Sequence, residues 1–167
     1  VDSDDYLSPS HLNNYIKYIG NYEIVYQGYC VFMEYSHNSE HVFTVSEKSA
    51  NNKDCMIDVL SDLLEVGNIF GFTWSKMFHA EIIRKNNILF KEDISIREDE
   101  IFTFEYCRYI KSIKVLQSTT YHYQLSENSL MRRRYFCPDE LLKVINYSYT
   151  TAIQITHNKR FCKIIED

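Results

Sequence analysis

The order of hydrophobic spacings along the chain is the feature that most limits its fold. Apolar residues recur at helical spacing in the segments 8–20, 54–66, 80–85 and 98–110, and again after Pro138. Runs rich in Val, Ile, Tyr and Phe predict strands in the segments 23–35, 41–46, 70–78, 89–96 and 113–125, the last as two runs. Helices and strands do not alternate strictly. The sequence therefore predicts a mixed α/β fold, in which a mixed sheet is flanked by helices.

The ends of the predicted helices carry recognisable signals. Ser8-Pro9 supplies an N-cap and a proline at the first helical position, and Gly20 ends the same helix. Pro138 is followed by two acids, which suit the positive end of the helix dipole. Thr and Ile residues from position 150 onwards weaken the prediction of a helix beyond that point.

Chain length and composition favour one domain with a real core. The chain has 167 residues, of which 45% are hydrophobic, and this argues against global disorder. Its formal net charge is -5, whereas a general nucleic-acid binder is usually basic, so nucleic acid is not predicted as a partner. The cysteine count of 5 is odd and includes no CxxC pair. A disulfide framework or a zinc site is therefore disfavoured, and a reducing cytoplasm fits better.

The start of the sequence is unusual. There is no Met at position 1, and an acidic cluster lies at the very end of the chain, where residues are usually frayed. The sequence contains no apolar stretch of roughly 20 residues and no signal peptide, so it predicts no transmembrane helix. We expect this chain to be a fragment of a longer protein.

The acidic cluster places three carboxylates within four residues, at Asp2, Asp4 and Asp5. Carboxylate oxygens are hard ligands, so the cluster suits Mg²⁺ or Mn²⁺, which would take further ligands from water and a substrate diphosphate. The alternative is a solvated acidic segment that leads into the first helix. Taken alone, the cluster favours this alternative, because short acidic runs are common.

A second acidic group, Glu98-Asp99-Glu100, lies where an aromatic-rich helix is predicted to begin. The positive end of the helix dipole favours an ionised Asp99, which is the form that a general base needs. The alternative is that these acids only cap the helix, and taken alone this interpretation is favoured.

The single tryptophan, Trp74, lies two residues before Lys76 in a predicted strand. Two residues at this spacing share one face of a strand. There the indole can stack on a sugar ring, and the ammonium can reach hydroxyl or phosphate groups. The alternative is a core tryptophan beside a lysine whose charged end extends to solvent. The sequence does not decide between them.

His122 lies in the strand-like run before a loop that contains Ser129 and Arg132. A histidine and a basic loop could contact a diphosphate or a metal ion. However, a lone histidine is more often structural. The arginine run 132–134 is more often a solvated face, although it could attract anionic lipid headgroups.

Taken in order, these groups resemble family 2 glycosyltransferases. The family's acidic DxD motif, followed by an aromatic residue and a helix that opens with Pro, matches residues 1–9. Its W-x-K-x-F, gI-x-F and helix-opening ED motifs match residues 74–78, 87–90 and 98–102, and its Y-x-Y…S segment matches 121–129. The resemblance runs from residue 1 to about residue 134, and five motifs in the right order make it fairly specific.

The resemblance implies a GT-A fold, in which a Rossmann-like nucleotide-binding half precedes a half for acceptor binding and catalysis. It implies that this chain is the C-terminal half, with residues 1–134 as the acceptor-binding and catalytic half and 135–167 as a C-terminal helical extension. Without a nucleotide-binding half we expect no independent donor binding and little or no sugar transfer. We also expect exposed apolar surface, which favours a homodimer.

The resemblance also implies a reaction. A sugar passes from a nucleotide-diphospho-sugar to an acceptor hydroxyl with inversion, assisted by Mn²⁺ or Mg²⁺, as in polysaccharide biosynthesis. The implied roles are metal binding for Asp2, Asp4 and Asp5; general base for Asp99; acceptor binding for Glu98, Trp74 and Lys76; and diphosphate or metal binding for His122, Ser129 and Arg132.

The acceptor class stays open between a polysaccharide, a lipid-linked saccharide and a teichoic-type polymer. The expected location is the cytoplasm, or the inner face of the membrane with peripheral association. Two other functions also stay open. An Asp-x-Asp phosphohydrolase is the less favoured, because Tyr6 follows the acids where Thr is expected. The other is a non-catalytic interaction or acceptor-binding module in which the acids are caps.

Overall fold

The computed structural model describes residues 1, 4–33, 39–66, 69–125 and 137–166. The helices are α1 (His11–Ile19), α2 (Lys53–Leu64), η1 (Thr73–Ser75, a 3-10 helix), α3 (Ala80–Lys85), α4 (Glu98–Cys107), α5 (Pro138–Ile155) and α6 (Lys159–Glu166). The strands are β1 (Tyr6–Leu7), β2 (Ile24–Met33), β3 (Ser39–Phe43), β4 (Lys48–Ala50), β5 (Lys76–Phe78) and β6 (Ile113–Leu125). The mixed α/β fold predicted from the spacing is confirmed.

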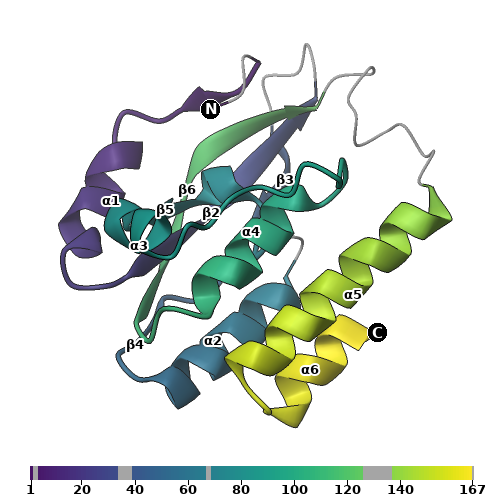
Figure 1. Cartoon of the computed structure of the whole chain (residues 1–167). Coiled ribbons are helices and arrows are strands. Elements are labelled where there is room, and N and C mark those ends of the chain that lie inside the picture. Colours follow the sequence, from purple (N-terminus) through teal and green to yellow (C-terminus); the bar gives the residue numbers. More distant parts are fainter. Residues whose placement is uncertain (2–3, 34–38, 67–68, 126–136, 167) are drawn as a thin grey trace.

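The described strands form one mixed sheet in the order β1-β6-β2-β3, with β4 paired to β6 and β5 paired to β2. The long strands β2 and β6 run parallel, whereas the other pairs are antiparallel. Parallel strands need a long crossover connection. Here that crossover contains α2, α3 and α4, so strands far apart in the sequence lie side by side (Figure 1).

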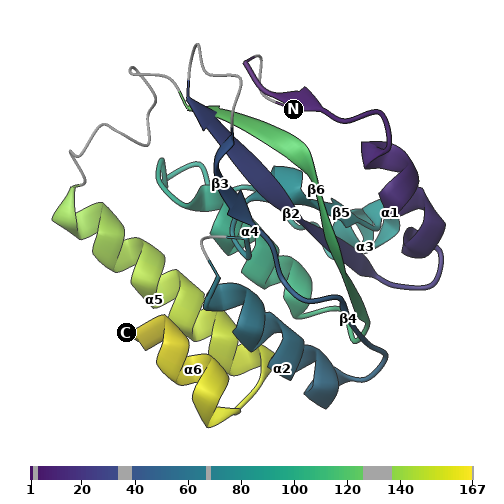
Figure 2. The ribbon, with the colours of Figure 1, turned by 180° about the vertical axis from the view of Figure 1, so that it is seen from behind.

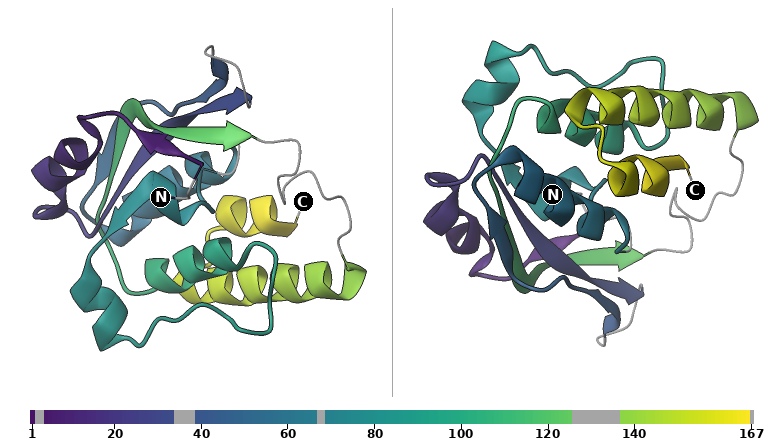
Figure 3. Two further views of the ribbon diagram at one scale, coloured as in Figure 1. Left: turned by 90° about the horizontal axis from the view of Figure 1, so that it is seen from above. Right: turned by 90° about the horizontal axis from the view of Figure 1, so that it is seen from below.

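Helices cover both faces of the sheet. The layer formed by α2, α4, α5 and α6 packs on one face, and α1 packs on the other (Figures 1 and 3). Successive residues of β2 serve the two faces: Ile24 and Tyr26 belong to the core under the helical layer, whereas Val25 packs with Tyr15 of α1. A strand buried on both faces explains the continuous apolar run in this part of the sequence.

The first helix lies on the opposite side of the molecule from α5 and α6 (Figures 1 and 2). It buries His11 and Tyr15, but Leu12 and Ile16 are 56% and 63% exposed. The apolar stripe predicted for this segment is therefore only partly covered in the structure.

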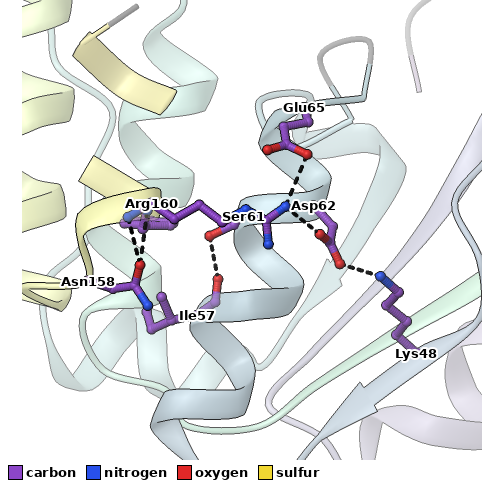
Figure 4. Close-up of polar contacts among 8 residues, drawn as sticks. Lys48, Ile57, Ser61, Asp62, Glu65, Asn158 and Arg160 are labelled. Carbon is purple, nitrogen blue, oxygen red and sulfur yellow. Dashed lines mark hydrogen bonds and ion pairs between the residues drawn. The ribbon is translucent and has the colours of Figure 1, made fainter. Parts of the chain in front are cut away.

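The last helix, α6, is joined to α2 by side-chain ion pairs (Figure 4). The Arg160 guanidinium donates from Nη2 to Asp62 Oδ1 at 2.8 Å and to Glu65 Oε2 at 3.0 Å. The other oxygen of Asp62 accepts a hydrogen bond from Lys48. Behind this surface network, Phe161 is completely buried in the main core. The C-terminal helices thus share the core of the rest of the chain.

Two strand predictions were wrong. In the segment 70–78 only β5 is a strand, and Trp74 lies in η1. The segment 89–96 consists of turns and irregular structure. Its strand-like pattern arises because Ile94 is buried against Ile101 and Val144. A buried apolar side chain in a loop gives the same signal as one on a strand.

Two boundaries also differ from the prediction. The two β-rich runs in 113–125 form one strand, with a shift of register against β2 between Gln27 and Tyr29. Helix α5 continues through residue 155, because Thr151 and Ile155 are buried and their packing outweighs their lower helix propensity. Within the described ranges, no helix combines the length and apolarity needed to cross a bilayer.

Candidate functional site

The acidic segment is fastened to the last strand. β1 pairs with β6, which places Tyr6 opposite His122 and Leu7 opposite Tyr121. The Asp5 carboxylate accepts from the Tyr121 hydroxyl at 2.6 Å and from the Gln124 amide at 2.7 Å. Two donors on one carboxylate hold it in place. Asp5 is therefore fixed by β6.

The other two acids of the segment differ from Asp5. Asp4 is exposed to solvent, and Asp2 lies outside the described residues. Ser129 and Arg132, which were predicted to contact a diphosphate or a metal, also lie outside them.

His122 lies directly beside the acidic segment, as a diphosphate or metal ligand at this position would require. Its ring stacks on Tyr6, with centroids 4.3 Å apart and planes at 3°, and its Nε2 shares a hydrogen bond of 2.7 Å with Ser8 Oγ. Its Nδ1 is buried and has no hydrogen-bond partner in the described part of the chain. Burial lowers the pKa of this imidazole, which favours the neutral form that binds metals.

Trp74 connects the acidic segment to the turn that precedes β5. Its indole stacks on Tyr121 at a centroid distance of 4.1 Å and on Phe72 at 4.7 Å. Tyr29 meets it edge-on at 4.9 Å. The indole is half-buried.

Lys76 does not share a strand face with Trp74. It begins β5, whereas Trp74 lies in η1, and only 6% of Lys76 is exposed. Its Nζ donates to the carbonyl oxygens of Phe70 at 2.8 Å and Gly71 at 3.2 Å, and also to that of Phe72. An ammonium has three donors and here all three are used, so this geometry favours a structural role over contact with an acceptor.

Asp99 is the second residue of α4, at the helix start where the sequence placed it. Its Oδ1 accepts from the Glu100 amide at 2.8 Å. The Thr103 hydroxyl lies 2.9 Å from the Asp99 carbonyl oxygen and 3.3 Å from the Gly71 carbonyl oxygen. The turn bound by Lys76 is thus also joined to the first turn of α4.

The acids on either side of Asp99 are partly desolvated. Burial raises the pKa of Glu98, and it raises the pKa of Glu100 against the opposing effect of Arg97. The Arg97 guanidinium grips the Glu100 carboxylate through two bonds of 2.9 and 2.7 Å. Arg97 itself adopts the left-handed backbone region, with φ of 54°, just before α4. This strained residue and its ion pair fix where the helix begins.

A continuous path of contacts therefore joins the predicted motifs. It runs from Asp5 through Tyr121 to Trp74, and then through the turn bound by Lys76 and the Thr103 hydroxyl to Asp99. The path brings together residues that are up to 116 positions apart in the sequence. The chemical roles of these residues stay predictions.

Two connecting residues were missed by sequence reasoning. Tyr121 was assigned only to a matching motif, although its position on a strand paired with β1 brings it to Asp5. Thr103 follows Asp99 by four residues, the spacing at which a threonine hydroxyl reaches a helix carbonyl. That spacing was a readable signal, whereas the Tyr121 contact depends on strand pairing.

The candidate site is defined by these contacts, and neither of two hollows in the described part of the chain lies at it. A hollow of about 380 Å³ lies where Ser95 meets Glu140 at the start of α5, and another of about 190 Å³ lies beside Arg97 and Glu100. Asp4, Asp99 and Trp74 line neither. Among the described residues, no three His, Cys, Asp or Glu side chains are grouped as metal ligands.

The sequence is similar to known glycosyltransferases, although no protein-family model matches it. EpsH and EpsJ of Bacillus subtilis (strain 168), both named as glycosyltransferases, are 21% and 27% identical over 136 and 133 residues. These alignments cover 80% and 78% of this chain and 38% of each relative. The poly(ribitol-phosphate) beta-N-acetylglucosaminyltransferase TarS of Staphylococcus aureus is 23% identical over 152 residues, covering 87% of this chain and 24% of TarS. The chain thus spans less than half the length of each of these relatives.

Solved structures of TarS show the same fold. TarS 1–349 in complex with UDP-GlcNAc superposes with a TM-score of 0.62 and 20% identity, covering 92% of this chain and 41% of that one. TarS 1–349 without a named ligand gives a TM-score of 0.63 with 16% identity, covering 99% and 44%. Sequence and structure together relate this chain to glycosyltransferases, and its mixed sheet flanked by helices is the fold of the corresponding part of the GT-A type domain of TarS.

Proposed function

We propose that this chain is the acceptor-binding and catalytic part of a glycosyltransferase that uses a nucleotide-diphospho-sugar. The observation that carries the proposal is the path of contacts from Asp5 to Asp99, which connects the acidic segment, the stacked rings around Trp74 and a second carboxylate. The similarity to EpsH, EpsJ and TarS supports sugar transfer as the chemistry. The complex of TarS with UDP-GlcNAc supports a UDP-sugar as the donor.

Asp99 is the proposed general base. Its place in the first turn of α4 puts the carboxylate at the positive end of the helix dipole. Oδ1 is engaged by the Glu100 amide, which orients the group and leaves Oδ2 to take a proton. Attack of the deprotonated acceptor oxygen on the anomeric carbon then breaks the bond to the diphosphate in one displacement. A single displacement inverts the anomeric configuration.

The acidic segment is the proposed metal site, with Asp2, Asp4 and Asp5 as carboxylate ligands and His122 beside them. Asp4 is exposed, and the neighbouring Asp5 carboxylate is held on β6 by Tyr121 and Gln124. The chemistry of these oxygen donors fits Mn²⁺ or Mg²⁺. When bound, such a cation would neutralise charge on the departing diphosphate. Ser129 and Arg132 remain proposed diphosphate contacts.

Trp74 and Glu98 are the proposed acceptor contacts. Stacked rings hold the indole of Trp74 in place, and its exposed part is the proposed contact for a sugar or polyol ring. Burial raises the pKa of Glu98. This carboxyl therefore takes up a proton more readily than a solvated one, and it can form hydrogen bonds with acceptor hydroxyl groups. Lys76, which the sequence also placed here, is buried and donates to backbone carbonyls instead.

The test is sugar transfer by the protein that carries this chain, followed as UDP release from UDP-N-acetylglucosamine and other UDP-sugars. Asp99→Asn keeps the shape of the side chain but removes its basicity, so transfer should fall by roughly 10²- to 10⁴-fold while UDP binding is retained. Asp93→Asn is the matched control, because Asp93 is an exposed carboxylate on the loop before α4. Normal transfer by the Asp99 variant would refute the proposed base.

A non-catalytic interaction module is the second candidate, favoured by Asp5 serving as a structural brace on β6. Calorimetry with UDP separates the two functions. A transferase should bind UDP more tightly with Mn²⁺ than with EDTA, and Asp4→Asn should abolish that difference. An interaction module should show no heat that depends on the metal.

A further inference from the structure

The turn before η1 directs three successive carbonyl groups at one point. The oxygens of Phe70, Gly71 and Phe72 all accept hydrogen bonds from Lys76 Nζ. The neighbouring Ser75 hydroxyl donates to Phe72 O at 2.8 Å as well. Converging carbonyl dipoles repel one another, so this conformation needs a cation or several donors at its centre. Lys76 provides both.

Burying the Lys76 ammonium removes it from water, which disfavours its charged form. Burial lowers the pKa of Lys76 to about 7. The titratable groups that face it are Asp99 and Glu100 from the first turn of α4, Cys107 from its last turn, and Tyr26 of β2, whose ring centroid lies 4.9 Å from Nζ. The two carboxylates favour the charged form, and a neutral amine would lack a third donor for the three carbonyls.

The turn bound by Lys76 contacts α4 on one side and the indole of Trp74 on the other. Toward α4, Gly71 O also lies 3.3 Å from the Thr103 hydroxyl, which lies 2.9 Å from the carbonyl oxygen of Asp99. Toward the aromatic surface, Phe72 stacks on Trp74 with planes at 15°. A movement of this turn would therefore displace both Trp74 and the first turn of α4.

We propose that Lys76 is a positioning residue: its buried ammonium locks the 70–72 turn and so holds Trp74 and Asp99 in one rigid relationship. This assigns Lys76 to the support of the acceptor site and removes it from contact with the acceptor. The importance of this relationship for catalysis rests on the proposed sugar transfer. The effect of Lys76 on the position of the turn can be measured without any transfer reaction.

Trp74 is the single tryptophan of the chain, so its fluorescence reports on this turn alone. We expect Lys76→Met, examined at a pH of roughly 6 where the native ammonium is charged, to raise the acrylamide quenching constant of Trp74 by roughly twofold through local opening. Far-UV circular dichroism at the same temperature verifies that the variant is folded. If it is not, Thr103→Val keeps the charge, removes one tie to the turn, and should raise quenching to a smaller extent.

Lys53→Met is the matched control. Lys53 Nζ also donates to three carbonyl oxygens, of Cys107 at 2.8 Å, Arg108 at 3.4 Å and Ile110 at 3.1 Å, but at the far end of α4. Its loss should leave the quenching of Trp74 unchanged. Equal quenching in Lys76→Met and the native protein, or an equal rise in Lys53→Met, would overturn the proposal.

Transfer kinetics provide the second readout. In the protein that carries this chain, Lys76→Met should lower kcat by roughly 10²-fold, because a misplaced base loses its alignment, and leave the KM for the UDP-sugar unchanged. If Trp74 responds but Asp99→Asn transfers sugar normally, the positioning role stands and the proposed base fails. If Asp99→Asn is inactive and Trp74 does not respond, the proposed function stands and the positioning role fails.

Discussion

Lys76 and Lys53 make the same kind of contact near opposite ends of α4. Each ammonium donates to three backbone carbonyls: Lys76 within the turn tied to the start of α4, and Lys53 at the end of α4. They differ in their surroundings. Lys53 is half-buried, whereas Lys76 is 6% exposed. Burial lowers the pKa of both.

The difference in burial shows that the Lys53 contact is of a common type, whereas the Lys76 contact is unusual. The last carbonyls of any helix lack partners and carry partial negative charge, so a lysine there is a common solution that water could replace. The 70–72 turn is buried and has no helix dipole to satisfy. A charge buried at such a site indicates that the position of this turn matters, since an apolar core would be the less costly alternative.

The largest expected effect is on the free energy of unfolding. Lys76→Met should lower it by about 3 kcal/mol or more, because buried carbonyls lose their donors and water cannot reach them. Lys53→Met should lower it by only about 1–2 kcal/mol, since water can hydrate the helix end. Urea denaturation followed by circular dichroism measures both. Equal losses would show that the two sites are equivalent.

The pH dependence of stability should also separate the two lysines. The pKa of Lys76 is about 7 in the folded protein, below its ordinary value of 10.5. Between these values the unfolded chain binds a proton that the folded protein has released, so the free energy of unfolding should rise with pH. Lys76→Met should flatten this rise more than Lys53→Met. An unchanged slope in Lys76→Met would mean that the lysine keeps an ordinary pKa when folded.

A smaller effect is expected at the hydroxyl that joins the turn to α4. Thr103→Val preserves side-chain shape and removes one donor, so it should cost about 1 kcal/mol. The loss should be additive with that of Lys53→Met and non-additive with that of Lys76→Met, because only Lys76 shares the Gly71 carbonyl with Thr103. A double-mutant cycle tests this, and additivity with Lys76→Met would disprove the coupling.

The smallest effect is expected at a third lysine. Lys48 forms an ion pair with Asp62 on the surface beside α6, and 39% of its side chain is exposed (Figure 4). Solvent screens such pairs, so Lys48→Met should change the free energy of unfolding by less than about 1 kcal/mol. A larger loss would place the ion pair between β4 and α2 among the main determinants of stability.

The sequence correctly predicted those helices and strands whose spacing of apolar residues matches the face that is buried in the structure. The predicted segments 54–66 and 98–110 coincide with α2 and α4 to within three residues at each end, because their apolar residues recur at the spacing of the buried helix face. The segment 89–96 was misjudged, because Ile94 is buried from a loop. The Thr and Ile residues of α5 were misjudged too, since their burial is a tertiary effect that outweighs propensity.

For the candidate site, the sequence identified most of the residues and little of their arrangement. Asp5, Trp74 and Asp99 were chosen by residue type and order. That Tyr121 joins Asp5 to Trp74 depends on the pairing of β1 with β6, which the local sequence does not encode. Lys76 was assigned to the acceptor because it follows Trp74 by two residues and would share its face on a predicted strand. Its burial follows from the fold of the turn around it.

The sequence by itself determined a mixed α/β fold, the helix start that carries Asp99 and the presence of two acidic groups. These are consequences of spacing and charge within short segments. Only the tertiary structure decided that Lys76 is enclosed by carbonyls while the similar Lys53 caps a helix. The physical reason is that solvation and hydrogen bonding of a side chain depend on which distant backbone groups surround it, and residue order alone does not specify those neighbours.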